Sequence, residues 1–134
     1  MTINHMAVYV TNLEAVRAFY ETYFDATSNA LYHNPNTGLK TYFLSFKDGA
    51  RLEIMHRSDV RAVSQVVADR LGYAHLALGV GSREAVDRLT ARLKSDGFAV
   101  LKEPRTTGDG YYESCVLDVE GNVLEIVAEY ENGK

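Results

Sequence analysis

The sequence predicts an α+β fold built from two copies of one strand–helix–strands module, and two observations support this prediction. The segment "NHMAVYVTNLEAVRAFYETYF" aligns without a gap with "AHLALGVGSREAVDRLTARLK", so that His5 falls on His75 at an offset of 70 residues. The segment "DGARLEIM" likewise aligns with "EGNVLEIV", which places Glu53 on Glu125 at an offset of 72 residues. Two blocks that repeat in the same order at nearly one offset indicate a duplicated supersecondary unit.

The size of the chain sets the organisation that the two modules can have. A chain of 134 residues suits one compact domain, so we expect a single domain over residues 1–134. Its internal modules are expected at about 1–56 and 72–130. The polar segment from His56 to Leu71, with scattered Val and Ala, is interpreted as a partly helical linker between them.

The first module begins with the β-rich run Ile3–Val10. A helix is predicted next, because Asn12 can cap it and Glu14 lies favourably in its first turn. Its apolar residues recur at helical spacing: Leu13, Val16, Phe19, Tyr20, Tyr23 and Phe24. Tyr42–Phe46 and Arg51–Met55 are predicted to form a hairpin around an Asp-Gly turn.

The second module repeats this order. Ser82 is the expected helix cap, and Gly97 is expected to end the helix. The β-rich runs are Tyr73–Val80, Phe98–Leu101, Cys115–Val119 and Val123–Ala128. The last two are predicted to form a hairpin around a Gly-Asn turn.

Composition excludes several classes of protein. The sequence is 46% hydrophobic and 24% charged, as in ordinary soluble domains, and it has a net charge of −4 and a pI near 5.5. This balance argues against a general affinity for nucleic acid or an anionic membrane. No apolar run is long enough to span a bilayer, and the start of the chain shows no signal-peptide pattern. The single cysteine, Cys115, excludes an internal disulfide and is interpreted as a buried structural thiol, so we expect a cytoplasmic protein.

The repeated His and Glu residues are the strongest chemical signal. Strand alternation places His5, Glu53, His75 and Glu125 on the faces that do not carry the bulkiest aliphatic side chains. Taken singly, a strand His is more often structural and a strand Glu is more often at the surface. Two His–Glu pairs at matching positions favour a metal site, provided that the modules pack with pseudo-twofold symmetry. The mixed N and O donors suit octahedral Zn²⁺, Ni²⁺, Co²⁺, Fe²⁺ or Mn²⁺ and leave positions open for substrate.

These residues resemble the vicinal oxygen chelate superfamily, which includes glyoxalase I (lactoylglutathione lyase). The resemblance is carried by "NHMAVYV", "YAHLAL", "RLEIM" and "DVEGNVLEI" and covers essentially the whole chain. It implies two βαβββ modules that form an incomplete barrel around one divalent metal, with Ni²⁺, Zn²⁺ or Co²⁺ favoured over Fe²⁺ and Mn²⁺. It also implies isomerisation through a metal-stabilised ene-diolate, with Glu125 or Glu53 as the base, and a homodimer acting on a small molecule.

Some positions depart from the pattern of glutathione-dependent members. Those members carry Arg four residues after the first His and Asn four residues after the second ligand, where this chain has Tyr9 and Arg57. This difference predicts that the thiol cofactor is bound differently. Substrate contacts are expected from Tyr9, from Arg57, from Arg105 in a predicted Gly-rich loop and from Tyr112. The plain alternatives are a solvated loop Arg and a Tyr that only packs.

The remaining choices stay open at this point. His33, in a turn-rich loop, and His56, which has the opposite strand parity from Glu53, are excluded as ligands. The alternatives in function are a metal-dependent dioxygenase and a non-catalytic drug-binding resistance protein of the same fold. The substrate, the metal, the identity of the base and the number of chains that build each site are not decided by the sequence.

Overall fold

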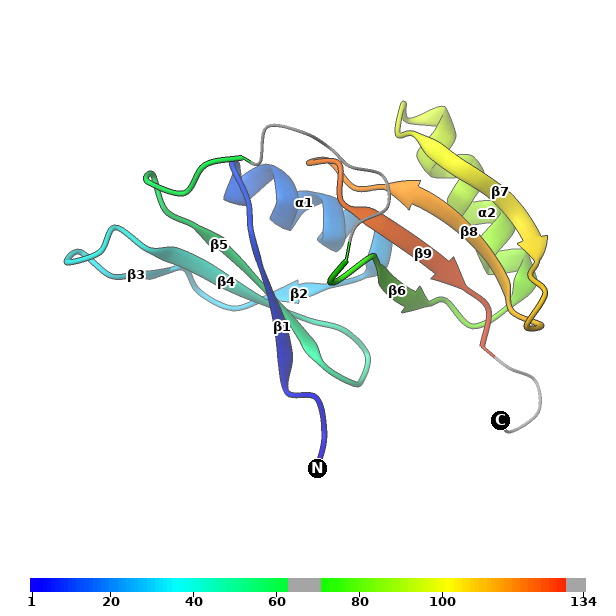
Figure 1. The fold of residues 1–134 in the computed structure, drawn as a ribbon, viewed down its shortest axis with the longest axis horizontal. Helices are drawn as coiled ribbons and strands as arrows, with labels where there is room; N and C mark the ends of the chain where they lie inside the picture. The colour runs from blue at the N-terminus through cyan, green and yellow to red at the C-terminus, as the bar shows by residue number, and fades with distance from the viewer. Residues whose placement is uncertain (63–70, 130–134) are drawn as a thin grey trace. The chain divides into compact units, whose positions relative to one another are not determined.

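The computed structural model describes residues 1–62 and 71–129. The chain forms two compact units, Met1–Val66 and Val67–Lys134, and the described residues of each form one helix and one sheet (Figure 1). The linker expected to be partly helical, His56–Leu71, includes residues 63–70, which lie outside the described residues. Before them, the N–H of Val60 donates to the carbonyl of Arg57 at 3.1 Å and closes a turn.

The first unit is a mixed sheet with one helix. Its elements are β1 (His5–Tyr9), α1 (Leu13–Phe24), β2 (Thr27–Ser28), β3 (Tyr32–His33), β4 (Lys40–Ser45) and β5 (Arg51–His56). The strand order is β1-β5-β4-β2, with β3 also paired to β4. Strand β1 runs parallel to β5, whereas β4 runs antiparallel to it. Because β5 occupies one edge of β4, the short strands β2 and β3 lie along its other edge.

The second unit repeats this topology. Its elements are β6 (Leu76–Gly79), α2 (Arg83–Ser95), β7 (Val100–Thr106), β8 (Tyr112–Leu117) and β9 (Val123–Val127). The order β6-β9-β8-β7 matches that of the first unit, with β2 and β3 together in the place of β7. Strand β6 is parallel to β9, as β1 is to β5. The predicted fold class, α+β with two βαβββ modules, is confirmed.

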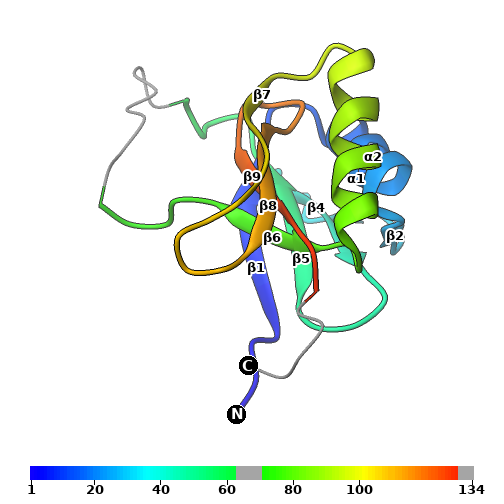
Figure 2. The same ribbon diagram turned by 90° about the vertical axis from the view of Figure 1, so that its right-hand side faces the viewer.

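Each helix covers the aliphatic face of its own sheet. In the first unit, α1 contacts β4 and β5. The buried side chains of this layer are Leu13, Val16, Phe19, Tyr20, Tyr42, Leu44, Leu52 and Ile54. In the second unit, α2 lies along the sheet that β7, β8 and β9 build (Figure 2). The corresponding buried side chains are Val86, Thr90, Leu93, Ser114, Val116, Leu124 and Ile126. The polar pair in this core is satisfied, because the Thr90 and Ser114 hydroxyls hydrogen-bond each other at 2.7 Å.

The predicted helix ends are confirmed. The Asn12 side chain accepts from the N–H of Ala15 at 3.0 Å, and the Ser82 hydroxyl accepts from the N–H of Ala85 at 3.2 Å. Caps of this kind stabilise a helix by about 1 kcal/mol each. Helix α2 ends before Gly97, whose φ of 94° is a conformation that favours glycine.

The two predicted hairpins are also present. Their turns use Gly49 and Gly121 at φ of 79° and 84°. In the second turn the buried Asp118 carboxylate accepts from the backbone N–H groups of Glu120 and Asn122, both at 2.9 Å. The Asp118 side chain therefore stabilises the turn formed by the "DVEGN" motif, which gives this carboxylate a structural role.

Two local expectations were wrong. His33 was placed in a loop but belongs to β3, and a two-residue strand carries no periodicity that a sequence could show. Arg105 was also placed in a loop but belongs to β7. Pro104 made this strand hard to predict, because proline has no backbone N–H to donate to a neighbouring strand. It is tolerated here because β7 is an edge strand. The β7–β8 register shifts between Lys102 and Arg105. Among the described residues, no helix is long and apolar enough to cross a membrane.

Candidate functional site

The first module brings His5 and Glu53 together. Glu53 of β5 lies opposite Ala7 of β1 in the parallel ladder, and His5 is two residues before Ala7 on the same face. The His5 Nε2 atom is 3.6 Å from the Glu53 Oε2 atom. The Glu53 side chain is 16% exposed, so it is largely shielded from solvent.

The second module repeats this pair at the same register. Glu125 of β9 lies opposite Ala77 of β6, and His75 is two residues before Ala77. The His75 Nε2 atom is 3.0 Å from the Glu125 Oε2 atom. The repeat in the sequence therefore corresponds to a repeated arrangement, with one His–Glu pair at the same register in each unit.

The surroundings of the two pairs differ. In the first module Phe43 of β4 faces Glu53, and its ring meets the His5 ring edge to face with centroids 5.3 Å apart. The Arg51 guanidinium lies over the Phe43 ring at 4.5 Å, and the Asn4 side chain contacts His5. The first pair thus has an aromatic ring, a cation and an amide as neighbours.

In the second module the corresponding neighbours are acidic and sulfur-bearing. Cys115 of β8 takes the place of Phe43 opposite Glu125, and Glu113 is on the same face. Arg105 donates to the Glu113 carboxylate at 3.3 Å and to the Glu113 carbonyl at 3.2 Å. Burial raises the pKa of Glu125, and the Glu113 carboxylate raises it further. Burial likewise raises the pKa of the Cys115 thiol, which agrees with its interpretation as a structural residue.

The expected substrate contacts divide into two kinds. Tyr9 is on the same face of β1 as His5, and Arg57 lies over its ring at 5.9 Å while pairing with Asp59. Tyr112 lies on the helix-covered face of β8, because its hydroxyl donates to Asp87 of α2 at 2.6 Å. Strand alternation therefore separates Tyr112 from the face that carries the second pair.

The other two histidines, His33 and His56, are both in the first unit. The His56 ring donates from Nδ1 to the Val10 carbonyl at 3.0 Å, which is a structural role at the end of β5. His33 is exposed on β3. Within residues 1–62 and 71–129, no group of three or more His, Cys, Asp and Glu side chains is placed to hold a metal ion.

The donor chemistry of each pair fits a divalent cation. Two donors bound side by side at about 2.0–2.2 Å to an octahedral metal are separated by about 3 Å. The observed separations of 3.0 and 3.6 Å lie at and slightly above that value. An imidazole nitrogen and a carboxylate oxygen are also the donors that borderline metals accept. An ordinary His–Glu ion pair accounts for one such contact, but less well for two at equivalent positions.

The chain belongs to the Glyoxalase/Bleomycin resistance protein/Dioxygenase superfamily, whose family model matches residues 2–126. It is 28% identical over 129 residues to the uncharacterized protein YqjT of Bacillus subtilis, covering 94% of this chain and 98% of that protein. The solved structure of a possible glyoxalase from Bacillus cereus is 26% identical, with a TM-score of 0.69, and the match covers 96% of this chain and 99% of that one.

The fold is also shared with maize glyoxalase I. That structure has a TM-score of 0.76 at 19% identity, and the match covers 98% of this chain. The chain spans about half the length of the maize enzyme, 46%.

Sequence reasoning missed three residues of this site. Asn4, Phe43 and Glu113 contact the His–Glu pairs, yet none repeats in the other module. Their counterparts by alignment and register are Ala74, Cys115 and Thr41. Strand parity could have placed Glu113 on the same face as Cys115, which lies opposite Glu125.

Proposed function

We propose that this protein is a divalent-metal-dependent lyase or isomerase of the glyoxalase type. Its substrate would be a small oxygenated molecule such as the hemithioacetal of an α-oxoaldehyde and a thiol. The observation that supports this proposal is the His–Glu pair that recurs at the same register in both modules. In this proposal, residues 1–134 act as one glyoxalase-like domain with internal modules at about 1–56 and 72–130.

The proposed metal ligands are His5, Glu53, His75 and Glu125. Their donor set suits Ni²⁺, Zn²⁺ or Co²⁺, with Fe²⁺ and Mn²⁺ as further candidates. A bound divalent ion would supply Lewis acidity, which stabilises negative charge on substrate oxygens.

The residues of the chain would transfer the proton. A carboxylate beside the substrate takes the proton from the carbon next to the carbonyl and returns it to the neighbouring carbon, so that no oxidant is needed. We assign this role to Glu125 or to its counterpart Glu53. The Phe43 ring and the partial burial of both carboxylates support it, since they limit the access of water to the transferred proton.

Substrate recognition is assigned to residues near the two pairs. Tyr9 offers an exposed aromatic side chain, and Arg57 and Arg105, which pair with Asp59 and Glu113, offer guanidinium groups that suit a carboxylate or another anion. Tyr112 was also expected here; it lies on the helix-covered face of β8, where its hydroxyl donates to Asp87. A homodimer in the cytoplasm completes the proposal.

The deciding experiment combines metal analysis with turnover. The purified protein is stripped with a chelator, reloaded with Ni²⁺, Co²⁺ or Zn²⁺, and assayed with methylglyoxal and several thiols, glutathione among them. Glu125→Gln is expected to slow turnover by about 100-fold or more if Glu125 is the base, and Glu53→Gln tests its counterpart in the same way. His33→Ala is the matched control, because this histidine is exposed on β3 and is not among the proposed ligands.

Other outcomes identify the rivals. Binding of a ligand without turnover by metal-loaded protein points to a sequestering protein, and metal-dependent oxygen consumption points to a dioxygenase. If no thiol adduct of an α-oxoaldehyde is turned over, the glyoxalase assignment is wrong.

A further inference from the structure

We propose that Asn4 and Arg51 act as a positioning pair that holds neutral His5 as the Nδ1–H tautomer, leaving its Nε2 lone pair directed at Glu53. This inference rests on the proposed function only where it concerns metal affinity. The tautomer itself is a property of the metal-free protein.

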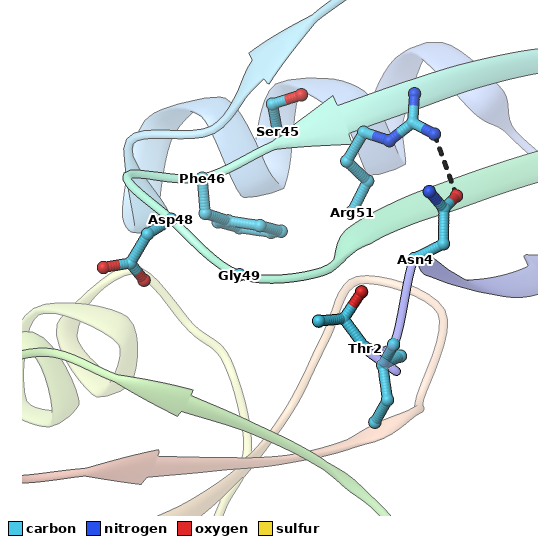
Figure 3. Close-up of a pocket in the computed structure, with 8 residues that line it drawn as sticks. Thr2, Asn4, Ser45, Phe46, Asp48, Gly49 and Arg51 are labelled. Atoms are coloured by element: carbon cyan, nitrogen blue, oxygen red, sulfur yellow. Dashed lines mark hydrogen bonds between the residues drawn. The ribbon is translucent and has the colours of Figure 1, made fainter.

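The three side chains meet at one oxygen atom. The Arg51 Nη2 atom donates to the Asn4 Oδ1 atom at 3.1 Å, at the wall of a surface pocket of about 520 Å³ (Figure 3). The His5 Nδ1 atom is 2.7 Å from the same Oδ1 atom. Both distances are within the range of a well-formed hydrogen bond.

Donor and acceptor chemistry then determines the tautomer. A guanidinium group only donates, so the Asn4 amide must present its oxygen to Arg51. An amide oxygen only accepts, so the His5 nitrogen that contacts it must carry the hydrogen. In the neutral ring the second nitrogen, Nε2, is therefore an unprotonated acceptor.

The Nε2 atom faces another acceptor. It is 3.6 Å from the Glu53 Oε2 atom, which is too long for a direct hydrogen bond. Two lone-pair donors that face each other gain from a cation placed between them. The hydrogen bond at Nδ1 thus prepares His5 as a ligand, in the way that second-layer partners orient metal-binding histidines in general.

Packing holds the positioning pair in place. Arg51 lies directly opposite His5 in the parallel ladder, and its backbone N–H donates to the Asn4 carbonyl at 3.1 Å. Its guanidinium lies over the Phe43 ring, which also contacts His5. The arginine is therefore restrained by the ladder, by a cation–π contact and by the amide.

The second module has no counterpart of this pair. By the alignment of the modules, Ala74 stands where Asn4 does, and Val123 stands where Arg51 does. Neither side chain can hydrogen-bond to His75. His75 is therefore an internal control for any experiment on His5.

The tautomer is tested by ¹⁵N NMR of the imidazole rings in the metal-free, full-length protein, at a pH where histidine is neutral. Loss of signals in His5→Gln identifies the His5 ring. In the unsubstituted protein we expect a protonated Nδ1 and an unprotonated Nε2. Asn4→Ala should shift the hydrogen toward Nε2, whereas Asn4→Asp, which keeps an oxygen acceptor, should preserve Nδ1–H. The His75 signals should stay unchanged in both variants.

Metal affinity provides the second measurement. Titration with Zn²⁺ or Ni²⁺ alone should show affinity 10- to 100-fold weaker in Asn4→Ala, restored in Asn4→Asp and unchanged in Thr2→Ala, a neighbour in the same pocket. An Nδ1–H tautomer that persists in Asn4→Ala would overturn the inference. If the unsubstituted protein bound no metal, the proposed function would be wrong. The NMR experiment would still test the positioning pair, because it measures the His5 tautomer in the metal-free protein.

Discussion

The substitution Glu125→Gln should stabilise the metal-free protein and destabilise the metal-loaded one. The Glu125 carboxylate is partly buried, it lies near the buried carboxylate of Glu113, and its pKa is raised by both influences. Because the folded-state pKa is raised, an ionised Glu125 carboxylate costs free energy in the folded protein. This cost grows as pH rises from the unfolded-state pKa through the folded-state pKa. Above the folded-state pKa this cost is complete, so there the neutral amide should raise the free energy of unfolding. Below about pH 4 the difference should vanish.

With metal present, Glu125→Gln should lower the free energy of unfolding instead of raising it. Loss of a second-layer partner weakens metal binding by about 10- to 100-fold, so loss of an anionic ligand should cost about 100-fold or more. At a metal concentration of about 100 times the dissociation constant, binding stabilises the unsubstituted protein by about 2.7 kcal/mol. The same concentration would stabilise the variant by only about 0.4 kcal/mol. For a domain of this size, the metal-induced rise in Tm should be on the order of 10 °C in the first case and about 2 °C in the second.

Thermal unfolding followed by circular dichroism, with and without Zn²⁺ or Ni²⁺ after chelator treatment, measures both effects. Glu103→Gln on the exposed surface of β7 is the matched control for removal of one carboxylate. A metal-free variant less stable than the unsubstituted protein would refute the argument from burial. An undiminished Tm rise with metal would refute Glu125 as a ligand.

Three further predictions concern the fold around the site. Because burial raises the pKa of the Cys115 thiol, a disulfide reagent at pH 8 should modify folded protein far more slowly than denatured protein, and equal rates would contradict the buried position. The pKa of Glu84 is lowered by hydrogen bonds to its own backbone N–H and to Ser82, so its contribution to stability should be present at pH 7 and disappear as pH falls through that lowered pKa. Urea midpoints of Glu84→Gln and of the unsubstituted protein should therefore differ at pH 7 and converge as pH falls below that lowered pKa. Ile54→Ala, at a fully buried position, should cost about 2–5 kcal/mol in urea unfolding, and a cost below 1 kcal/mol would contradict the packing of α1 on β5.

The sequence by itself determined the features that depend on local patterns. Apolar spacing and the Asn12 and Ser82 caps predicted both helices, and glycine turns predicted both hairpins. Strand alternation placed His5 with Glu53 on one kind of face, because side chains on a strand alternate with a fixed period. The internal repeat then identified the second pair without knowledge of any fold.

The tertiary structure alone decided which side chains meet across strands. The contact of Asn4 with Arg51 joins residues 47 positions apart, and the contact of Arg105 with Glu113 depends on a register shift beside Pro104. Neither contact leaves a periodic signal, because ladder register is set by packing and turn geometry rather than by residues near in sequence. The two modules therefore share their His–Glu pairs, which the repeat encodes, and differ in the neighbours that support them, which only the folded sheets bring into place.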